Sequence, residues 1–185
     1  DKIEYINLDL SEHLRIIEVI KKIKPKYFFN LAAQSFVKYA YDNPIYTDQV
    51  NNQSVINILE AIRQFSKKTK FYQASSSEMF GDNPEYPQSE ETKFMPASPY
   101  ACSKVFAHSI CNNYRQSYGM HISCGILFNH ESPRRGETFV TRKISIAAAR
   151  IKKGLQEKLY LGNLEAKRDW GFAGDYVEAM WLMLQ

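Results

Sequence analysis

The sequence predicts an α/β fold in which a parallel sheet carries helices on both faces. The main observation is that short β-rich segments alternate with longer segments of helical period, and no repeat or low-complexity tract interrupts them. In addition, the chain has 185 residues, of which 44% are hydrophobic, so it is long enough to bury the core that such a sheet requires.

The expected strands are short runs rich in β-branched and aromatic residues. We expect them at residues 3–7, 26–32, 70–75, 121–128 and 158–162.

The expected helices lie between and after these strands. One carries an apolar stripe from Val55 to Phe65. The next begins with Ser98 as N-cap and Pro99 at the first helical position, and Gly119 is suited to end it. A third is expected over residues 139–153, and an amphipathic helix over 174–185.

Composition excludes several classes of protein. The formal charge of +4, from 24 basic and 20 acidic residues that are interleaved, does not favour nucleic acid as a partner. Basic runs at residues 21–26 and 150–153 suit the ends of helices instead. No apolar run is long enough to span a membrane, so we expect no membrane partner.

The cysteines and histidines predict no metal site. Cys102, Cys111 and Cys124 have no metal-ligand spacing, and their odd number favours free thiols in a reducing compartment. With no signal-peptide profile at the N-terminus, the expected location is cytoplasmic.

Polar side chains follow the apolar runs at the ends of three predicted strands. These segments are "AAQSFV", "SSSEMFG" and "NHESPRRGETF". Since the carboxyl ends of parallel strands meet at one edge, where such sheets bind ligands, we expect the three segments to converge on one rim.

Tyr100 and Lys104 are spaced to share one face of the predicted helix. Residues at i and i+4 have β-carbons roughly 6 Å apart, so the two side chains can touch. An adjacent ammonium favours the phenolate, which would make Tyr100 a usable base. The alternative is a surface tyrosine with a lysine stacked on it.

Ser76 and Glu78 follow the predicted strand before this helix. They would point to the same side if the extended conformation persists to residue 78. The alternative is a turn serine followed by a solvated glutamate. Together with Tyr100 and Lys104 they form a set able to move the proton of an alcohol and a second proton on a neighbouring carbon.

Five segments carry a resemblance to a known family: "NLAAQSFV", "ASSSEMFG", "SPYACSK", "LFNHESPRRGETFVTRKI" and "LGNLEAKRDWGFAGDYVEAM". Together they resemble the GDP-mannose 4,6-dehydratases of the extended short-chain dehydrogenase/reductase superfamily. The resemblance covers almost the whole chain. Tyr-x-x-x-Lys identifies only the superfamily, whereas the two longest segments identify the dehydratase.

The resemblance implies a Rossmann-like doubly wound parallel sheet. On this pattern residues 1–128 form part of an NAD(P)-binding domain, and residues 129–185 form a mixed region that contributes a substrate-binding loop and helices. The chain has no Gly-rich phosphate-binding motif, so we expect the first βαβ unit to be missing. We expect the C-terminus to be cut as well, and the 185 residues alone to be inactive.

The implied activity converts GDP-mannose to GDP-4-keto-6-deoxymannose with a tightly held NADP. C4 is oxidised, water is eliminated across C5 and C6, and the hydride returns to C6. Tyr100 would take the proton of the 4-hydroxyl, with Lys104 lowering its pKa and holding the nicotinamide ribose. Ser76, where the family commonly has threonine, would hydrogen-bond O4, and Glu78 would remove the C5 proton.

Further contacts are carried over by resemblance. Those implied for the cofactor, which would be NADP with NAD left open, are Asp9, Leu10, Leu31, Ala32, Ala33, Gln34, Tyr100, Lys104, Asn129 and His130. Those implied for GDP-mannose are Asn129, Arg135, Val140, Lys143 and Arg168. For Asp9 the alternative is a local turn with Ser11 as a helix N-cap. The family also implies a homo-oligomer, either a dimer or a tetramer.

Two other functions stay open. A related sugar-nucleotide epimerase or 4-keto reductase would keep Tyr100 and Lys104 but would not need Glu78. A cofactor-sensing regulator on the same fold would gain nothing from two bases.

Overall fold

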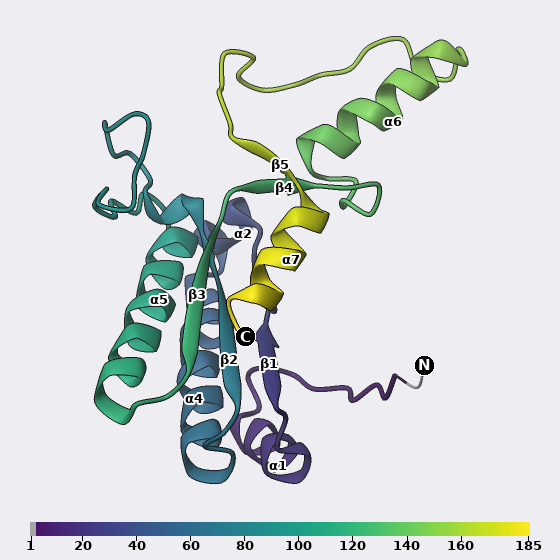
Figure 1. Ribbon diagram of the computed structural model, residues 1–185. Helices are drawn as coiled ribbons and strands as arrows, with labels where there is room; N and C mark the ends of the chain where they lie inside the picture. The colour runs from purple at the N-terminus through teal and green to yellow at the C-terminus, as the bar shows by residue number, and fades with distance from the viewer. Residues whose placement is uncertain (1–2) are drawn as a thin grey trace. The chain divides into compact units, whose positions relative to one another are not determined.

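Three parallel strands form the sheet on which the predicted site depends (Figure 1). In this computed structural model, which describes residues 3–185, β1 (Tyr27–Asn30), β2 (Lys70–Ser76) and β3 (Ile122–Leu127) pair in the order β1-β2-β3. The register aligns Phe28 with Phe71 and Phe71 with Ile122. The predicted parallel α/β class is confirmed, and the carboxyl ends of these strands lie at one edge.

Two predicted strands are wrong. Residues 3–7 and 158–162 form no strand, and no described strand pairs with either segment. Ile3 is 71% exposed and Tyr5 88% exposed, so the β-rich residues of the first segment have no neighbouring surface on which to pack. Side-chain composition alone does not make a strand without a hydrogen-bonding partner.

Three helices cover one face of the sheet. They are α1 (His13–Ile23), α4 (Ser54–Phe65) and α5 (Pro99–Tyr118). Their apolar side chains meet those of β2 and β3 in one core, which contains Ile16, Ile20, Val55, Ile58, Leu59, Ala61, Ile62, Phe71, Ala107, Cys111, Tyr114, Met120 and Ile122. Burial of this apolar stripe against the sheet is the main stabilisation of the helices.

Helix α5 has the boundaries that the sequence predicts. Ser98 is extended, with φ −148° and ψ 158°, and its Oγ accepts a hydrogen bond from the backbone N–H of Ala101 at 3.0 Å. Pro99 occupies the first turn, and Gly119 ends the helix in the left-handed region at φ 64°. These two end signals place Tyr100 within the first turn.

The start of helix α1 differs from the alternative for Asp9, in which Ser11 is the helix N-cap. Its N-cap is Glu12, which makes no side-chain capping bond, and Ser11 donates from both its N–H and its hydroxyl to Asp9 Oδ1 at 2.8 Å. Ser11 is therefore not the cap. Lys21 and Lys22 lie in the last turn, as the charge pattern predicts.

A run of helical segments that the sequence analysis did not resolve joins β1 to α4. It consists of α2 (Val37–Asp42), α3 (Pro44–Asp48) and the π-helical turn η1 (Gln49–Gln53), which leads directly into α4. Turns of π-helix are rare in proteins, and those that occur are often found at functional sites.

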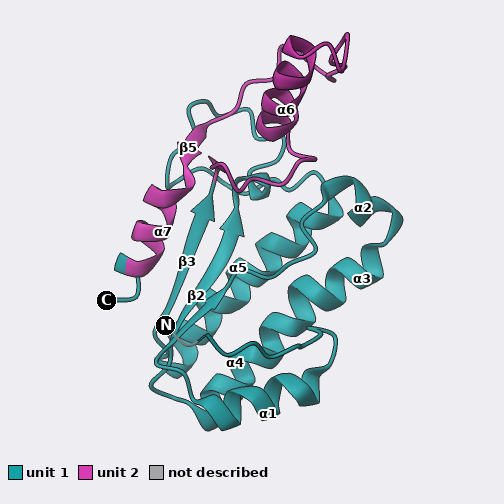
Figure 2. Ribbon diagram, turned by 90° about the vertical axis from the view of Figure 1, so that its right-hand side faces the viewer, with its two compact units in different colours: residues 1–127, 182–185 teal, residues 128–181 magenta. Residues whose placement is uncertain are grey.

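The chain divides into two compact units, which Figure 2 colours separately. Unit 1 comprises Asp1–Leu127 and Leu182–Gln185, and unit 2 comprises Phe128–Trp181. Within unit 1 the last residues pack closely, since Leu184 is fully buried and its carbonyl accepts from Lys70 Nζ at 2.8 Å. The division into a cofactor-binding and a substrate-binding part stays a prediction.

Unit 2 contains the parallel pair β4 (Asn129–Glu131) and β5 (Trp170–Phe172), helix α6 (Val140–Lys152), and most of α7 (Ala173–Leu182). Helices near 139–153 and 174–185 are confirmed. The two strands were not predicted, because three residues are too few to show a period. No helix among the described residues is both long and apolar enough to cross a membrane.

Candidate active site

Tyr100 and Lys104 lie one turn apart in the first part of α5, and both are buried. Tyr100 is 8% exposed and Lys104 is 5% exposed, and the Lys104 Nζ lies 5.7 Å from the centroid of the Tyr100 ring. The predicted contact is confirmed. The alternative of an exposed tyrosine with a lysine stacked on it is wrong, because neither side chain is at the surface.

The Lys104 ammonium ties α5 to the end of β2. Its Nζ donates a hydrogen bond to the backbone carbonyl of Ala74 at 3.0 Å. Burial lowers the pKa of Lys104 to about 8, because the charged form loses hydration. Within residues 3–185 no carboxylate forms an ion pair with it, so further N–H groups of this buried cation are available to a polar ligand.

Ser76 ends β2 and caps the short helix η2 (Ser77–Met79). Its backbone is extended, with φ −145° and ψ 145°, and its Oγ accepts a hydrogen bond from the backbone N–H of Glu78 at 3.2 Å. The extended conformation on which the same-side prediction for Ser76 and Glu78 depends does not persist to residue 78, because the chain turns at Ser77, as in the alternative of a turn serine. Glu78 is nevertheless held beside Ser76 by this capping bond, with its side chain exposed.

The pKa of the Tyr100 phenol depends on both Ser76 and Glu78. Burial raises its pKa above the usual value, a hydrogen bond with the Ser76 side chain lowers the pKa, and the negative charge of Glu78 raises it. Ser76, Glu78 and Tyr100 thus form one cluster at the carboxyl end of β2.

The net direction of the Tyr100 pKa is opposite to the sequence-based prediction, in which Lys104 lowers it. The physical reason is that desolvation is the largest cause and favours the neutral phenol. The Lys104 ammonium is directed to the Ala74 carbonyl instead.

Asn51, which the sequence analysis missed, supports this cluster from η1. It is 3% exposed, its Oδ1 accepts from the Gln34 backbone N–H at 2.9 Å, and its Nδ2 donates to the Gln34 carbonyl at 3.0 Å. The same Nδ2 donates to Ser103 Oγ at 2.9 Å, and the Ser103 hydroxyl donates to the Tyr100 carbonyl at 2.7 Å. Only the fold reveals this role, since an asparagine in a helical run gives no signal in the sequence.

The predicted cofactor residues after β1 lie at the same end of the sheet. Leu31 is 57% exposed and Ala32 is exposed, so this edge is open to a ligand. Gln34 is held by the two bonds to Asn51 and donates from Nε2 to the Phe36 carbonyl at 3.0 Å. These hydrogen bonds fix the position of Gln34 in the loop.

Asp9 and Leu10 are engaged locally. The hydrogen bonds from the Ser11 backbone and hydroxyl hold the pKa of Asp9 below its usual value, and Leu10 packs against the core. These contacts favour a structural turn here.

In unit 2, His130 has a defined orientation. Its Nδ1 lies 2.8 Å from the Phe128 carbonyl, which only accepts, so Nδ1 carries a proton and donates it to that carbonyl. The ring packs on Tyr176 with centroids 5.1 Å apart. A Cβ at Gly171 would lie 2.4 Å from the Tyr176 ring, so this close packing requires glycine at that position.

Arg135 of unit 2 is held from two sides. Its Nε lies 3.2 Å from Glu131 Oε2, and its guanidinium carbon lies 3.7 Å from the centroid of the Phe139 ring. The Thr141 hydroxyl donates to the same Glu131 carboxylate. Glu131 was missed in the sequence analysis, although it lies four residues before Arg135, a spacing typical of ion pairs in helices rather than loops.

The remaining predicted residues of unit 2 are more exposed. Lys143 Nζ donates to the Tyr160 carbonyl at 2.8 Å, and Arg168 donates to the adjacent Lys167 carbonyl at 2.7 Å. Val140 begins α6 and is 41% exposed, and Asn129 begins β4 and is partly buried. No contact among the described residues joins these four side chains to one another.

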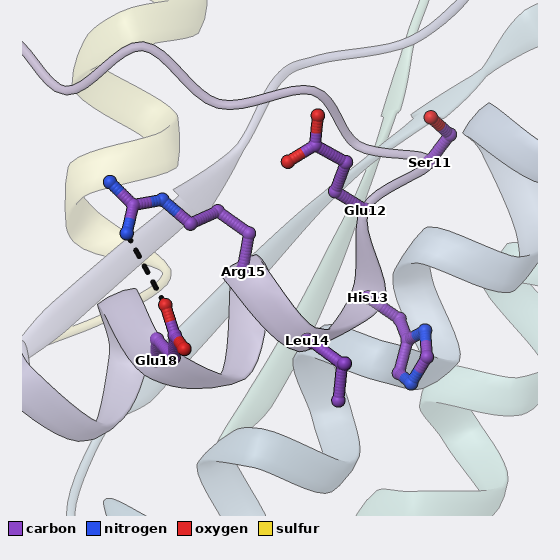
Figure 3. A pocket seen from close by; sticks show the side chains of 6 residues that line it. All are labelled: Ser11, Glu12, His13, Leu14, Arg15 and Glu18. Carbon is purple, nitrogen blue, oxygen red and sulfur yellow. Dashed lines mark hydrogen bonds and ion pairs between the residues drawn. The ribbon is translucent and has the colours of Figure 1, made fainter.

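A surface hollow at the start of α1 is a separate feature. Ser11, Glu12, His13, Leu14, Arg15 and Glu18 line it, and Arg15 forms an ion pair with Glu18 at 3.2 Å (Figure 3). None of the predicted site residues lines it. Over residues 3–185, no cluster of three potential metal ligands is present either.

Comparison with known proteins identifies the family of this chain. The family model described as GDP-mannose 4,6 dehydratase matches residues 1–185. GDP-mannose 4,6 dehydratase 2 of Arabidopsis thaliana is 57% identical over 189 residues, which cover 100% of this chain and 50% of that protein. GDP-mannose 4,6-dehydratase of Sinorhizobium fredii (strain HH103) is 51% identical over 179 residues, or 96% of this chain and 51% of that protein. The chain thus spans about half the length of these curated relatives.

Solved structures show the same architecture. RMD from Pseudomonas aeruginosa complexed with NADPH matches with a TM-score of 0.89 and 29% identity, over 96% of this chain and 62% of that one. UDP-glucose 4-epimerase of Thermus thermophilus, in complex with NAD, matches with a TM-score of 0.81 and 31% identity, over 96% of this chain and 58% of that one. From the family match over its whole length and the identity to its relatives, the chain belongs to the GDP-mannose 4,6-dehydratase family.

Proposed function

We propose that this chain carries the catalytic cluster of an enzyme that converts GDP-mannose to GDP-4-keto-6-deoxymannose. The observation that carries the proposal is the meeting of two potential bases at one strand end. A hydrogen bond with the Ser76 side chain lowers the pKa of Tyr100 and the charge of Glu78 raises it, and the Glu78 N–H donates to the same Ser76 Oγ at 3.2 Å. The names of the relatives, which are GDP-mannose 4,6-dehydratases, support the substrate.

The chemistry requires two bases that act in a fixed order. Tyr100, as phenolate, accepts the proton of the 4-hydroxyl while C4 is oxidised. The Ser76 hydrogen bond favours this phenolate and burial opposes it. Only once C4 is a ketone is the C5 proton acidic enough for a carboxylate, and Glu78 then accepts it as the hydroxyl at C6 departs with a proton.

Lys104 and the loop after β1 fit a nicotinamide cofactor, which we propose to be NADP, with NAD as the alternative. When bound, it would take the hydride lost from C4 and supply it to C6, while C5 takes up a proton. The buried Lys104 ammonium, which donates to the Ala74 carbonyl, has further N–H groups for ribose hydroxyls. The exposed edge at Leu31 and Ala32 suits a close approach of the pyrophosphate. RMD, a structural relative, is complexed with NADPH.

Residues of unit 2 are proposed to hold the nucleotide. Arg135 and Lys143 supply cationic groups of the kind that a diphosphate needs, and Arg168 adds a third. Asn129 and Val140 complete the proposed GDP-mannose contacts, and His130 is proposed as a cofactor contact, with its ring oriented by the bond to the Phe128 carbonyl. A homo-oligomer is part of the same proposal, as is a cytoplasmic location, which the free thiols of Cys102, Cys111 and Cys124 support.

The test is product analysis with the full-length protein that carries these 185 residues. We expect GDP-mannose to lose one water and gain a 4-ketone, and the Tyr100→Phe variant to form no product. An epimerised or reduced sugar nucleotide that retains all its oxygens would instead identify the epimerase or 4-keto reductase alternative and would contradict the proposal.

A further inference from the structure

Ser75, the residue before Ser76 in β2, is bonded to the same helix that carries Tyr100. It is 3% exposed, and its Oγ lies 3.0 Å from His108 Nδ1. His108 lies on α5 one turn after Lys104 and two turns after Tyr100. Because residues spaced by four share a helical face, these three side chains of α5 all face the end of β2.

The imidazole of His108 is itself held in place. The Phe94 ring meets it edge-on, with centroids 5.3 Å apart and an interplanar angle of 78°, and Phe94 packs on Phe80 at 5.3 Å. Burial and the charge of Arg115 lower the pKa of His108, so the ring is neutral at neutral pH. A neutral imidazole has one donor and one acceptor nitrogen, and Nδ1 is used by Ser75.

Three consecutive residues of β2 therefore interact with α5. The Ala74 carbonyl accepts from Lys104 Nζ at 3.0 Å, the Ser75 Oγ lies 3.0 Å from His108 Nδ1, and a hydrogen bond with the Ser76 side chain lowers the pKa of Tyr100. The first and third bonds involve the proposed catalytic groups. The middle contact has no assigned role in the chemistry; it lies between the other two along β2, and on α5 its partner His108 lies one turn beyond Lys104.

We propose that Ser75 and His108 form a positioning pair that sets the distance between the Ser76 hydroxyl and the Tyr100 phenol. The inference rests on the proposed function. Ser76 follows Ser75 directly, so a shift of Ser75 moves the Ser76 hydroxyl by a similar amount. Since a misplacement of about 1 Å at a reacting group costs on the order of 100-fold in rate, a partial shift at this point lowers turnover measurably.

The test compares Ser75→Ala, His108→Phe, their double variant and His108→Asn in the full-length enzyme. We expect Ser75→Ala and His108→Phe each to lower kcat by about 10-fold with KM within about twofold, because the substrate contacts stay in place. The double variant falls no further, since each change breaks the same bond. His108→Asn, whose amide can reach the position of Nδ1, recovers most of the activity.

Ser66→Ala is the matched control. It also removes a buried hydroxyl, whose Oγ lies 2.8 Å from Thr69 Oγ1 in the turn that precedes β2. It lowers the melting temperature and leaves kcat unchanged. If Ser75→Ala and His108→Phe behave like this control, the pair is structural and the proposal is overturned. Additive losses in the double variant overturn it as well.

A second readout needs no substrate and separates this inference from the proposed function. The ¹³C NMR signal of Tyr100 Cζ, assigned with Tyr100→Phe, reports ionisation of the phenol. A weaker Ser76 bond removes the influence that lowers the Tyr100 pKa, so Ser75→Ala raises that pKa. An unchanged titration overturns the positioning pair even where dehydration is observed. A raised pKa supports the pair even where the enzyme proves to act on another sugar nucleotide.

Discussion

The Lys104 Nζ lies 5.7 Å from the centroid of the Tyr100 ring, with both side chains buried on one face of α5. This places a cation where it costs stability, because burial lowers the Lys104 pKa from 10.5 to about 8. Because the pKa of Lys104 is lower in the folded state than in the unfolded state, the unfolded chain binds a proton first. The folded protein therefore loses stability as the pH falls from 10.5 towards 8. At neutral pH the charged Lys104 therefore opposes folding.

Lys104→Met is accordingly expected to stabilise the ligand-free protein. The shift of the pKa to about 8 corresponds to about 3 kcal/mol at pH 7, and the lost hydrogen bond to the Ala74 carbonyl offsets about 1 kcal/mol of that gain. The advantage should shrink as the pH rises from 8 towards 10.5, where the lysine is neutral in both states. Urea unfolding at several pH values measures it. Lys67→Met, which removes an exposed lysine, is the matched control.

Ser76→Ala is expected to move the pH dependence of turnover. The Ser76 hydrogen bond lowers the Tyr100 pKa, so its loss leaves the phenolate less favoured and shifts the alkaline rise of kcat/KM to higher pH. Ser76→Thr keeps the hydroxyl and should retain the wild-type profile. A Ser76→Ala profile that overlays the wild type would remove this hydroxyl from the account.

The start of α5 gives a stability prediction. Ser98→Ala removes the hydrogen bond to the Ala101 N–H and should cost about 1 kcal/mol in the free energy of unfolding. Ser117→Ala, at an exposed position near the other end of the same helix, should cost nothing measurable. Equal effects in the two variants would show that the cap does not define the helix start. Chemical denaturation of both variants makes the comparison.

Close packing in the sheet gives a second stability prediction. A Cβ at Gly125 in β3 would lie 2.1 Å from Tyr72 Oη and 2.8 Å from its Cζ, and Tyr72 is fully buried in β2. Gly125→Ala should therefore destabilise the protein by about 1–3 kcal/mol, since the ring has no room to move. Gly162→Ala, at a position with open space, serves as the control. A melting temperature for Gly125→Ala equal to that of the control would contradict this packing.

The parts of the site that sequence could predict are those set by local signals. Ser98, Pro99 and Gly119 define α5, and their spacing alone places Tyr100 and Lys104 on one face. The direction of the Tyr100 pKa could not be predicted, because desolvation depends on what covers the ring.

Other features depend on tertiary contacts as well. Asn51 is hydrogen-bonded to Gln34 and Ser103, and His108 is hydrogen-bonded to Ser75. These partners are far away in the sequence, so no local pattern reveals the contacts. The strands β4 and β5 are too short to show a period.

The central claim is that Glu78 removes the C5 proton of a substrate whose 4-hydroxyl is handled by Tyr100. The direct measurement is deuterium incorporation at C5 of the 4-keto-6-deoxy product formed from GDP-mannose in heavy water, comparing the full-length wild type with Glu78→Gln, whose amide cannot act as a base. The account predicts that Glu78→Gln binds GDP-mannose with unchanged affinity and shows about 100-fold or more loss of both deuterium incorporation and water elimination. Deuterium incorporation and dehydration at the wild-type rate in Glu78→Gln would contradict it.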